Sequence, residues 1–494
     1  MILSLVLVPA FAASLAFALR SDTARRWLLV GTAGVHAALV AACWLGQVPR
    51  PTRGSWLALD EPGLVFLAII TALFLASSIY ATGYLRREGA GPRPDFEEGV
   101  LFADAPERVF SGCLLLFLST MTLVTVSHHM GLLWVAIEAT TLASAPLIYF
   151  HRHHRSLEAT WKYLLLCSVG IALALLGTFF LAVAASDPAG TQPPLVLDGL
   201  VAAAPGLNHL WLRAAAIFLL VGYGTKMGLA PLHAWLPDAH SESPSLVSAL
   251  MSGALLNCAF LGILRTWQIC AAAGDGGFMA RLLIALGLLS MVVAAGLILG
   301  QADYKRMLAY SSVEHMGILS LAVGIGGGAH YGAMLHAVNH SLTKASLFLV
   351  SGNILAAYRT KSAREVNGLT RALPVSGPLW VAGFLAITGS PPFGSFLSEL
   401  VILRSALEQG HGFVAAAYLA LLTVIFIGMC GIVLRMAQPG EPAAASTPPA
   451  RRREALTSVL PPLALAAAVL ALGLHIPAAL GDLLARAGDA LRIP

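Results

Sequence analysis

Apolar segments of about 20 residues recur along the whole chain, and short polar connections separate them. A helix of about 20 residues crosses the roughly 30 Å of hydrocarbon in a bilayer. The alternation of apolar and polar residues that a membrane barrel requires does not occur. The pattern therefore predicts an all-α polytopic membrane protein with about 14 transmembrane helices. The predicted spans are residues 1–19, 27–45, 62–84, 109–127, 130–150, 159–184, 210–230, 244–266, 281–300, 307–327, 329–357, 374–408, 412–435 and 456–478.

The seventh and twelfth predicted spans are interrupted by residues that break helices. Gly228 and Pro231 end the seventh span, and Pro391 and Pro392 cut the twelfth. The twelfth span comes five spans after the seventh. Because each span crosses the membrane once, this odd offset places the second half upside down relative to the first. Interrupted helices at matching positions of two inverted halves mark the ion path of many transporters. We therefore expect two inverted five-helix repeats with discontinuous helices 7 and 12.

This pattern divides the chain into four parts. The predicted parts are helices 1–3 in residues 1–108, a first repeat of helices 4–8 in residues 109–266, a second, inverted repeat of helices 9–13 in residues 281–435, and a linker with helix 14 in residues 436–494.

The composition excludes several classes of protein. Hydrophobic residues make up 57% of the chain and charged residues 11%, far from the balance of a soluble protein. Residues 1–19 lack the flanking charge and the cleavage site of a signal peptide, so we expect a first spanning helix. Lysine and arginine gather in alternate loops, which predicts that both termini lie outside the cytoplasm. This topology explains the net charge of +5 without a nucleic-acid partner.

No cofactor and no metal site are expected. The six cysteines lie singly, without the paired spacing of a zinc or iron–sulfur site. The glycine-rich loops that bind nucleotide phosphates do not occur in the chain. The sequence thus predicts a subunit without a redox or nucleotide site of its own, and whether it belongs to an enzyme stays open. Energy must come from a partner subunit or from an ion gradient.

Lys226 lies in the interrupted seventh span, and Glu138 is the isolated charge of the fifth. A lysine in the middle of a bilayer costs roughly 3 kcal/mol on insertion scales, so its presence indicates a function. Burial disfavours both charged forms, whereas a facing opposite charge stabilises both. We expect Glu138 to face Lys226, so that loosening the pair releases the proton of the lysine. A static ion pair is the alternative, but buried pairs stabilise poorly compared with apolar packing.

Three titratable residues of the eleventh span, His336, His340 and Lys344, are spaced four residues apart. This spacing places them on one face of a helix, over about two turns. Two histidines at this spacing also suit zinc, but no third ligand follows nearby in the sequence. Histidine titrates near neutral pH, so we favour a hydrated proton relay.

Further charged residues lie near the ends of the predicted spans. Glu399 follows the break in the twelfth span and is a candidate for the last carrier before proton release. In the tenth span, His315 is a candidate bridge between the halves, whereas Glu314 could equally face a neighbouring subunit. Lys305, at the start of that span, fits a solvated charge of a cytoplasmic loop. The polar connector 238–242 either gates proton uptake or caps the next helix.

Five segments of the chain resemble the antiporter-like membrane subunits of respiratory complex I, multisubunit cation/proton antiporters and energy-converting hydrogenases. These segments are WVAIEATTLASAP, GYGTKMGLAPLHAWLPDAHSESPS, DYKRMLAYSSVEHMG, NHSLTKASLFLVSGNI and ITGSPPFGSFLSE. Within this family the chain is most similar to hydrogenase-4 component F. The resemblance covers about spans four to thirteen.

The resemblance implies a fourteen-helix fold with two inverted five-helix repeats, and proton translocation coupled to electron transfer in neighbouring subunits. It implies that Glu138 is the pair-forming glutamate, Lys226 the broken-helix lysine and Glu399 the broken-helix acid of the second half. Asn257 departs from the family pattern, because many relatives have a lysine there. Asparagine orders water but carries no proton as an ammonium does. The chain also ends without the long lateral helix of one complex I subunit, which argues against that subunit.

The sequence therefore predicts a proton-translocating membrane subunit of a hydrogenase-4-like or complex I-like oxidoreductase. Its expected partners are other membrane subunits, redox subunits and the lipid bilayer, in the inner membrane of a bacterial or archaeal cell. A sodium/proton antiporter subunit is the first alternative, with Na⁺ as the second ion. The membrane subunit of an inorganic-carbon uptake complex, or a non-conducting scaffold, is the other.

Overall fold

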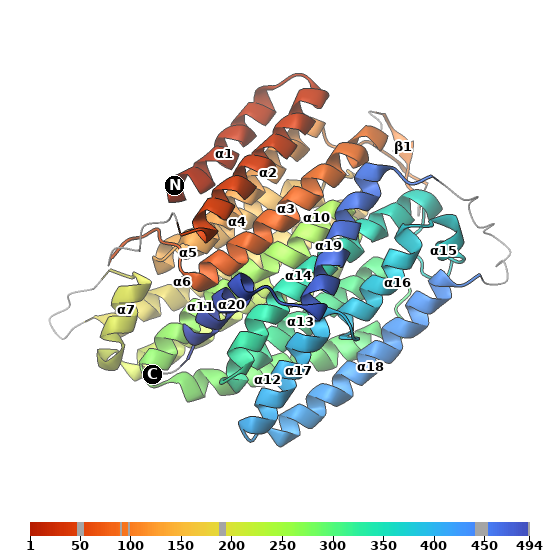
Figure 1. The fold of residues 1–494 in the computed structure, drawn as a ribbon. Coiled ribbons are helices and arrows are strands. Elements are labelled where there is room, and N and C mark those ends of the chain that lie inside the picture. The colour runs from red at the N-terminus through yellow and green to blue at the C-terminus, as the bar shows by residue number, and fades with distance from the viewer. Residues whose placement is uncertain (47–53, 89–90, 97–98, 187–193, 440–452, 493–494) are drawn as a thin grey trace.

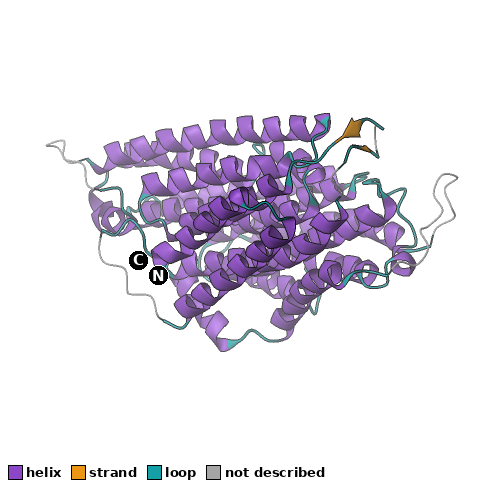
Figure 2. Ribbon diagram, turned by 90° about the horizontal axis from the view of Figure 1, so that it is seen from above, coloured by secondary structure: helices purple, strands orange, loops and turns teal. Residues whose placement is uncertain are grey.

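The computed structural model describes residues 1–46, 54–88, 91–96, 99–186, 194–439 and 453–492. Long helices run side by side through the molecule, and the two ends of the chain lie at the same end of the bundle (Figures 1 and 2). In the described part, 11 helices are long and apolar enough to cross a membrane. The all-helical, multi-spanning architecture predicted from the sequence is confirmed.

The helices up to the first interruption are α1 (Ile2–Ala18), α2 (Asp22–Trp44), α3 (Glu61–Arg87), α4 (Glu107–Val126), α5 (Met130–Ile148), α6 (His154–Ala185), α7 (Leu197–Ala203), the 3-10 turn η1 (Ala204–Gly206) and α8 (His209–Met227). The next are α9 (Trp235–Glu242), α10 (Ser245–Leu250), the π turn η2 (Met251–Leu255), α11 (Leu256–Ala272), α12 (Gly276–Ile298), α13 (Tyr304–Ile325) and α14 (Ala329–Tyr358). The last are α15 (Leu369–Ala372), α16 (Ser376–Ile387), α17 (Gly394–Glu408), α18 (Gly412–Ala437), α19 (Leu456–Leu474) and α20 (Ala478–Asp489). Two short strands, β1 (Arg93–Pro94) and β2 (Leu101–Phe102), pair antiparallel in a loop.

Each of the fourteen predicted spans coincides with a helix or with a pair of helices. Hydropathy finds them because a chain that crosses lipid must satisfy its backbone hydrogen bonds within the helix. In the seventh span α8 ends at Met227, before the helix resumes as α9, and the twelfth span is divided into α16 and α17, so both predicted interruptions are confirmed. The relation of the two five-helix sets as inverted repeats stays a prediction.

Three local features depart from the predicted pattern. The segment 185–209, expected to be a loop, contains α7, and the amphipathic helix α20 follows the last predicted span. The eighth span contains the π turn η2, where Gly253 lies against the backbone of Ser341 on α14. Such turns occur at functional sites in many helices. The predicted linker, residues 436–455, lies mostly outside the described residues.

Helix α14 is the centre of the second half. It packs against α3, α10, α13, α16, α17, α19 and α20. Nearly every side chain along its 30 residues is buried, although it carries histidine, asparagine and lysine. Helix α19 packs against α3 on one side and α14, α16 and α17 on the other, so it joins the N-terminal helices to the second half.

One ion pair anchors the start of α3 to α11. Asp60 caps α3 and accepts hydrogen bonds from both terminal nitrogens of the Arg265 guanidinium, at 2.5 and 2.7 Å. Arg265 is 1% exposed. Burial alone raises the pKa of the Asp60 carboxyl, but Arg265 outweighs this effect and holds the pKa well below its usual range.

Candidate functional site

Helix α8 ends one residue after Lys226, because Gly228 adopts a left-handed conformation with a φ of 82°. Glycine reaches this conformation without steric cost and commonly ends helices. The chain becomes helical again at Trp235, whose indole N–H donates to the carbonyl of Thr225 at 2.8 Å. The interruption therefore leaves Lys226 fully buried at the end of a half-helix.

Lys226 contacts two hydroxyl groups. Its Nζ atom donates to Thr141 Oγ1 at 2.8 Å and to Tyr163 OH at 2.6 Å. Thr141 in turn donates to Glu138 Oε2 at 3.3 Å. The lysine and the glutamate lie on one path, but a threonine bridge replaces the direct contact that we expected.

The position of Glu138 on α5 explains the missing direct contact. Its side chain is only partly buried, and on the same helical face Val135 is 48% exposed and Leu142 63% exposed. The carboxylate therefore lies near the outer surface of the subunit, where Ser168 donates to it at 2.9 Å. Thr141, one turn further along α5, is the residue that reaches inward to the lysine.

Sequence reasoning missed the hydroxyl groups of this first cluster. Thr141 and Ser144 follow Glu138 at three and six residues, so helical spacing alone could have placed them on neighbouring faces. Tyr163 comes from α6, and its hydroxyl is 2.6 Å from Ser144 Oγ. Its ring also lies 4.4 Å from the ammonium of Lys226. No local signal in the sequence identifies this tyrosine.

Asn257 lies where the two halves meet. Its Nδ2 atom donates to Gly253 O within α11 and η2, and to Ser341 Oγ on α14, both at 2.8 Å. Its Oδ1 atom is buried and has no hydrogen-bond partner among the described residues. The predicted role of Asn257 at the junction thus has a matching position, with one acceptor left open.

The second cluster contains three buried histidines. His336 and His340 lie on one face of α14 as predicted, and their ring centroids are 6.5 Å apart. His315 comes from α13, and its ring centroid is 5.1 Å from that of His336 and 4.8 Å from that of His340. His315 therefore lies with the histidines of α14, and its role as a bridge between the halves stays a prediction.

The hydrogen bonds around His336 determine which ring nitrogens carry protons. Ser398 donates its hydroxyl hydrogen to Ser395 O at 2.8 Å, so Ser398 Oγ accepts from His336 Nδ1, 3.0 Å away. His336 Nε2 is then an acceptor, and His315 Nδ1 donates to it at 2.9 Å. This assignment follows from the network, as it must where hydrogens are not observed. It leaves His315 Nε2 as a buried acceptor without a partner in the described part of the chain.

Glu399 lies beside this pair of histidines. One ligand atom from each of His315, His336 and Glu399 lies within 4.8 Å of the others. The carboxylate packs against Gly389, at the interruption, where a Cβ atom would overlap it. Its Oε1 atom is buried without a hydrogen-bond partner within the described ranges. The broken twelfth span therefore places its acid beside the histidines, and the role of Glu399 as a proton carrier stays a prediction.

Lys344 and Glu314 complete the second cluster. Lys344 Nζ donates to Leu308 O of α13 at 2.7 Å, and it interacts electrostatically with Glu314. Glu314 is 2% exposed, and its Oε2 atom is 3.9 Å from His315 Nε2. The alternative that Glu314 faces a neighbouring subunit is therefore wrong, because α13 turns it towards the core.

Charged residues of α9, the start of α13 and the segment after α14 form a third group. Lys305 is 1% exposed and donates to Ser241 O at 3.0 Å and Ser243 O at 2.7 Å, so the expectation of a solvated loop charge is wrong. Lys361 donates to Glu242 at 2.7 Å. Burial raises the pKa of the Glu242 carboxyl, but Lys361 outweighs it and holds that pKa below its usual range. These groups line a cavity of about 410 Å³.

His240 lies between the third group and the second cluster. It is fully buried, stacks on Phe348 of α14 at 4.9 Å, and interacts electrostatically with Lys305 and Lys344. Both of its ring nitrogens lack hydrogen-bond partners in the described part of the protein. The connector after the first break thus brings a titratable ring to the core, which favours proton uptake over helix capping for this residue.

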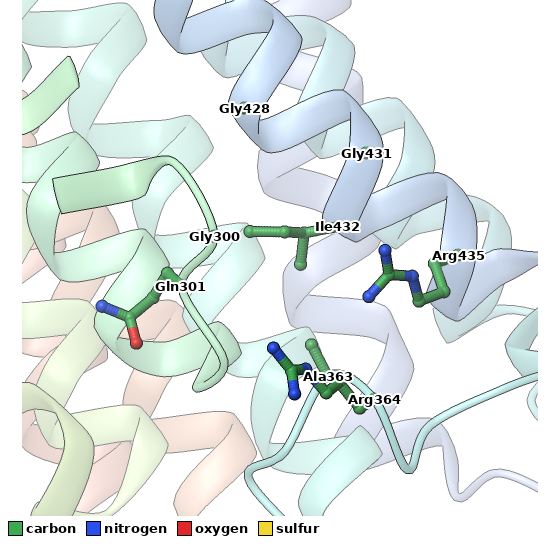
Figure 3. Close-up of a pocket in the computed structure, with 8 residues that line it drawn as sticks. All are labelled: Gly300, Gln301, Ala363, Arg364, Gly428, Gly431, Ile432 and Arg435. Atoms are coloured by element: carbon green, nitrogen blue, oxygen red, sulfur yellow. The ribbon is translucent and has the colours of Figure 1, made fainter. Parts of the chain in front are cut away.

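A second cavity of about 210 Å³ opens at the same end, between the end of α12 and α18. The side chains of Arg364 and Arg435 point into it, and Gly428 and Gly431 form its wall (Figure 3). None of its lining residues belongs to the clusters around Lys226 or His336.

Comparison with known proteins gives three matches that bear on this arrangement. The family model described as NADH:quinone oxidoreductase/Mrp antiporter, TM, matches residues 127–426. The hydrogenase-4 component F homolog of Methylacidiphilum infernorum (isolate V4) is 39% identical over 398 residues, which are 80% of this chain and 81% of that protein. NADH-quinone oxidoreductase subunit N of Desulforudis audaxviator (strain MP104C) is 29% identical over 446 residues, 86% of this chain and 83% of that one.

Among solved structures, a chain of the membrane-bound sulfane sulfur reductase, an archaeal respiratory membrane complex, matches with a TM-score of 0.86. The two chains are 20% identical, and the match covers 99% of this chain and 97% of the other. At this identity the likeness establishes a shared fold.

Proposed function

Because the chain belongs to the NADH:quinone oxidoreductase/Mrp antiporter transmembrane family, we propose that it is the proton-translocating membrane subunit of a hydrogenase-4-like or complex I-like oxidoreductase. Electron transfer in partner subunits would supply the energy, since the chain has no nucleotide-binding fingerprint of its own. The cell or inner membrane of a bacterium or archaeon is the proposed location.

The observation that carries this proposal is the second cluster. His315, His336, Lys344 and Glu399 are all buried inside a membrane protein, and two of them are joined by a hydrogen bond of 2.9 Å. Titratable groups inside a membrane are costly and commonly mark proton paths. Apolar residues of similar volume would stabilise the fold at least as well. Proton transfer is the property that these side chains have and apolar residues lack.

We infer the order of the proton transfers in this cluster from its hydrogen bonds. His315 Nε2 is the open acceptor, and it faces Glu314. When His315 takes a proton there, it can pass its Nδ1 proton to His336 Nε2. His336 can then release its own Nδ1 proton towards the carboxylate of Glu399, because Ser398 already donates its hydrogen to the backbone carbonyl of Ser395. We propose that protons travel from Lys344 and Glu314 through the histidines and leave past Glu399.

The first cluster, around Lys226, would determine whether a proton is available to the path. Lys226 exchanges protons, and the Thr141 bridge passes changes at Glu138 to the lysine. Glu138 lies near the outer surface, where an ionised carboxylate in lipid is costly, so we propose that another membrane subunit covers this face. Movement of a charge in that subunit would then bias Lys226. Protons would cross to the second half through water near Asn257.

The energies involved are of matching size. Moving one charge against 100 mV requires about 2.3 kcal/mol. A hydrogen bond to a charged group contributes about 1.5–3 kcal/mol. Making or breaking one contact of the Lys226 ammonium is therefore enough to change the direction in which a proton moves at that membrane potential.

The test uses the assembled complex in sealed vesicles, with electron transfer and proton uptake measured in parallel. Lys226→Ala and Glu138→Gln should each abolish the pH gradient while electron transfer continues. Lys162→Ala is the matched control, because this exposed lysine of α6 binds Asp238 outside both clusters. If both variants pump protons as the wild type does, the chain is a non-conducting scaffold and the proposal fails.

The sodium/proton antiporter subunit is the second candidate, because the family includes Mrp antiporters. The same vesicles distinguish the two. A pH gradient that appears on addition of Na⁺, without any redox donor, would favour antiport. A gradient that requires the redox donor and is indifferent to Na⁺ would favour coupled proton pumping.

A further inference from the structure

His315, His336 and Glu399 have the composition of a site for a divalent transition metal. The three residues come from α13, α14 and α17, and all are buried. One ligand atom of each lies within 4.8 Å of the other two. Two imidazoles and one carboxylate form the protein ligands of several zinc sites, with a fourth position left open. The local sequence around His336 does not reveal the third ligand, Glu399, because it lies 63 residues further along the chain.

We propose that this triad binds Zn²⁺ or a related first-row divalent cation, and that the bound metal blocks the proton path. The ligand atoms would be His315 Nδ1, His336 Nε2 and a carboxylate oxygen of Glu399. Imidazole nitrogens suit these metals, whereas magnesium and calcium prefer oxygen ligands. The block rests on the proposed function of the path, but the binding does not.

The two facing nitrogens are already arranged for a shared cation. His315 Nδ1 and His336 Nε2 lie 2.9 Å apart with one proton between them. Two nitrogens bound to one tetrahedral zinc lie about 3.3 Å apart, for zinc–nitrogen distances of 2.0–2.1 Å. The metal therefore takes the place of the shared proton, and the rings separate by a few tenths of an ångström.

One outer nitrogen has a hydrogen-bond partner and the other lies near a carboxylate, the kinds of group that metal-bound histidines use. His336 Nδ1 donates to Ser398 Oγ at 3.0 Å, which leaves Nε2 free for a metal. His315 Nε2 has an open position 3.9 Å from Glu314 Oε2. When the metal takes Nδ1, the ring proton moves to Nε2 and donates to Glu314. Such carboxylate–histidine–metal arrangements orient the ring and strengthen the ligand.

Charge and protons are also balanced when the metal binds. Each histidine stays neutral, since the proton displaced from His315 Nδ1 is carried by Nε2. Glu399 and Glu314 must both be ionised in the metal-bound site, so each of them that is protonated releases one proton to solvent as the metal enters. The carboxylates of Glu399 and Glu314 offset the two positive charges of the cation, which a buried site requires. Oε1 of Glu399 is one of the buried atoms left without a partner among the described residues.

The experiment measures metal binding by the purified complex after treatment with a chelator. Zn²⁺ is added, unbound metal is removed, and bound zinc per chain is counted by mass spectrometry. Co²⁺ reports the geometry, because its visible absorption differs between tetrahedral and octahedral sites. We expect one zinc per chain and a tetrahedral cobalt spectrum. His336→Asn and Glu399→Gln should each weaken zinc binding at least a hundredfold, and Glu314→Gln tenfold to a hundredfold.

His330→Asn is the matched control. His330 is a buried histidine of α14, the helix that carries His336. It is hydrogen-bonded to Val323 O and lies outside the triad. This variant should bind zinc as the wild type does. Elution volume and thermal unfolding of each variant show whether it is folded. The proposal is overturned if the wild type binds no stoichiometric zinc, or if folded His336→Asn and Glu399→Gln bind it as tightly as the wild type.

Proton pumping provides the second readout. Zn²⁺ should stop pumping in wild-type vesicles, and a chelator should restore it. Metal binding without inhibition would overturn the block and would also count against the proposed path. Pumping that depends on the second cluster, in a complex that binds no zinc, would remove the metal site and leave the proposed function standing.

Discussion

Replacing Thr141 with valine removes the hydroxyl between Lys226 and Glu138 and keeps the volume of the side chain. The hydroxyl accepts from Lys226 Nζ at 2.8 Å and donates to Glu138 Oε2 at 3.3 Å. In the variant, the ammonium keeps only its bond to Tyr163, at 2.6 Å. The lysine and glutamate are both still present, so the change separates the connection from the charges.

The size of the effect follows from the bond that is lost. A hydrogen bond to a charged group contributes about 1.5–3 kcal/mol, and each 1.4 kcal/mol changes an equilibrium about tenfold. The protonated form of Lys226 therefore becomes at least tenfold rarer relative to the neutral form. Because a charge moved against 100 mV costs about 2.3 kcal/mol, the loss is as large as the work the step must perform.

The assay is proton uptake per electron transferred by the complex in sealed vesicles. Thr141→Val should lower this ratio at least tenfold, while electron transfer without a membrane potential stays at the wild-type rate. Thr141→Ser is the matched control, because it keeps the hydroxyl and loses the methyl group. If valine pumps normally and serine does not, Thr141 acts through packing and the bridge has no role.

Three further substitutions test other parts of the structure. Asp60→Asn should lower the stability of the chain by about 3–5 kcal/mol, because Arg265 would keep a buried charge without its partner. Its depressed pKa means that Asp60 stabilises the fold fully above about pH 4 and that this contribution is lost as the pH falls further, so the difference between variant and wild type closes in acid. Gly389→Ala should abolish pumping, because its Cβ would overlap the carboxylate of the second broken helix, whereas Gly410→Ala, at a similar φ in open space, should not. Asn257→Leu should lower pumping at least tenfold, because it removes the open acceptor at the junction.

Each of these tests has a defined failure. Thermal unfolding in detergent between pH 3 and pH 8 measures the first, and a deficit that persists unchanged at pH 3 contradicts the ion-pair account. The vesicle assay measures the other two. Equal losses in Gly389→Ala and Gly410→Ala would assign the effect to backbone strain. A leucine at position 257 that conducts normally would show that protons cross elsewhere.

The fold was largely predictable because lipid imposes a simple rule on the sequence. Each span must satisfy its own backbone, which requires about 20 apolar residues, and glycine and proline mark the interruptions. The short helix α7 and the amphipathic helix α20 were not predicted, because neither is long and apolar enough to be found as a membrane span. The π turn η2 was not predicted, and the close approach of Gly253 to the backbone of Ser341 is a contact between helices that no local pattern shows.

The candidate site was predictable only within single helices. His336 and His340 share a face of α14 because of their spacing, so the sequence identifies them together. Glu314 and Lys305 both lie on α13, and their positions in the sequence are those that solvated charges also take. Only the packing of α13 determines that both are buried. Glu399 meets the histidines through the interruption of the twelfth span. Contacts between helices thus account for the residues that pattern analysis misplaced.

The hydrogen bonds of Asn257 at the junction between the halves favour a path through water. Asn257 donates to Ser341 Oγ at 2.8 Å, and Ser341 donates its only hydrogen to Ala337 O at 2.6 Å. This chain of donors ends at a backbone carbonyl, which accepts a hydrogen bond but does not pass a proton on. The free acceptor is Asn257 Oδ1, buried and without a partner in the described part of the chain. A buried polar atom of this kind is commonly satisfied by ordered water. We therefore propose that a proton crossing from Lys226 to the second half travels on water held at Oδ1, with the asparagine as its anchor.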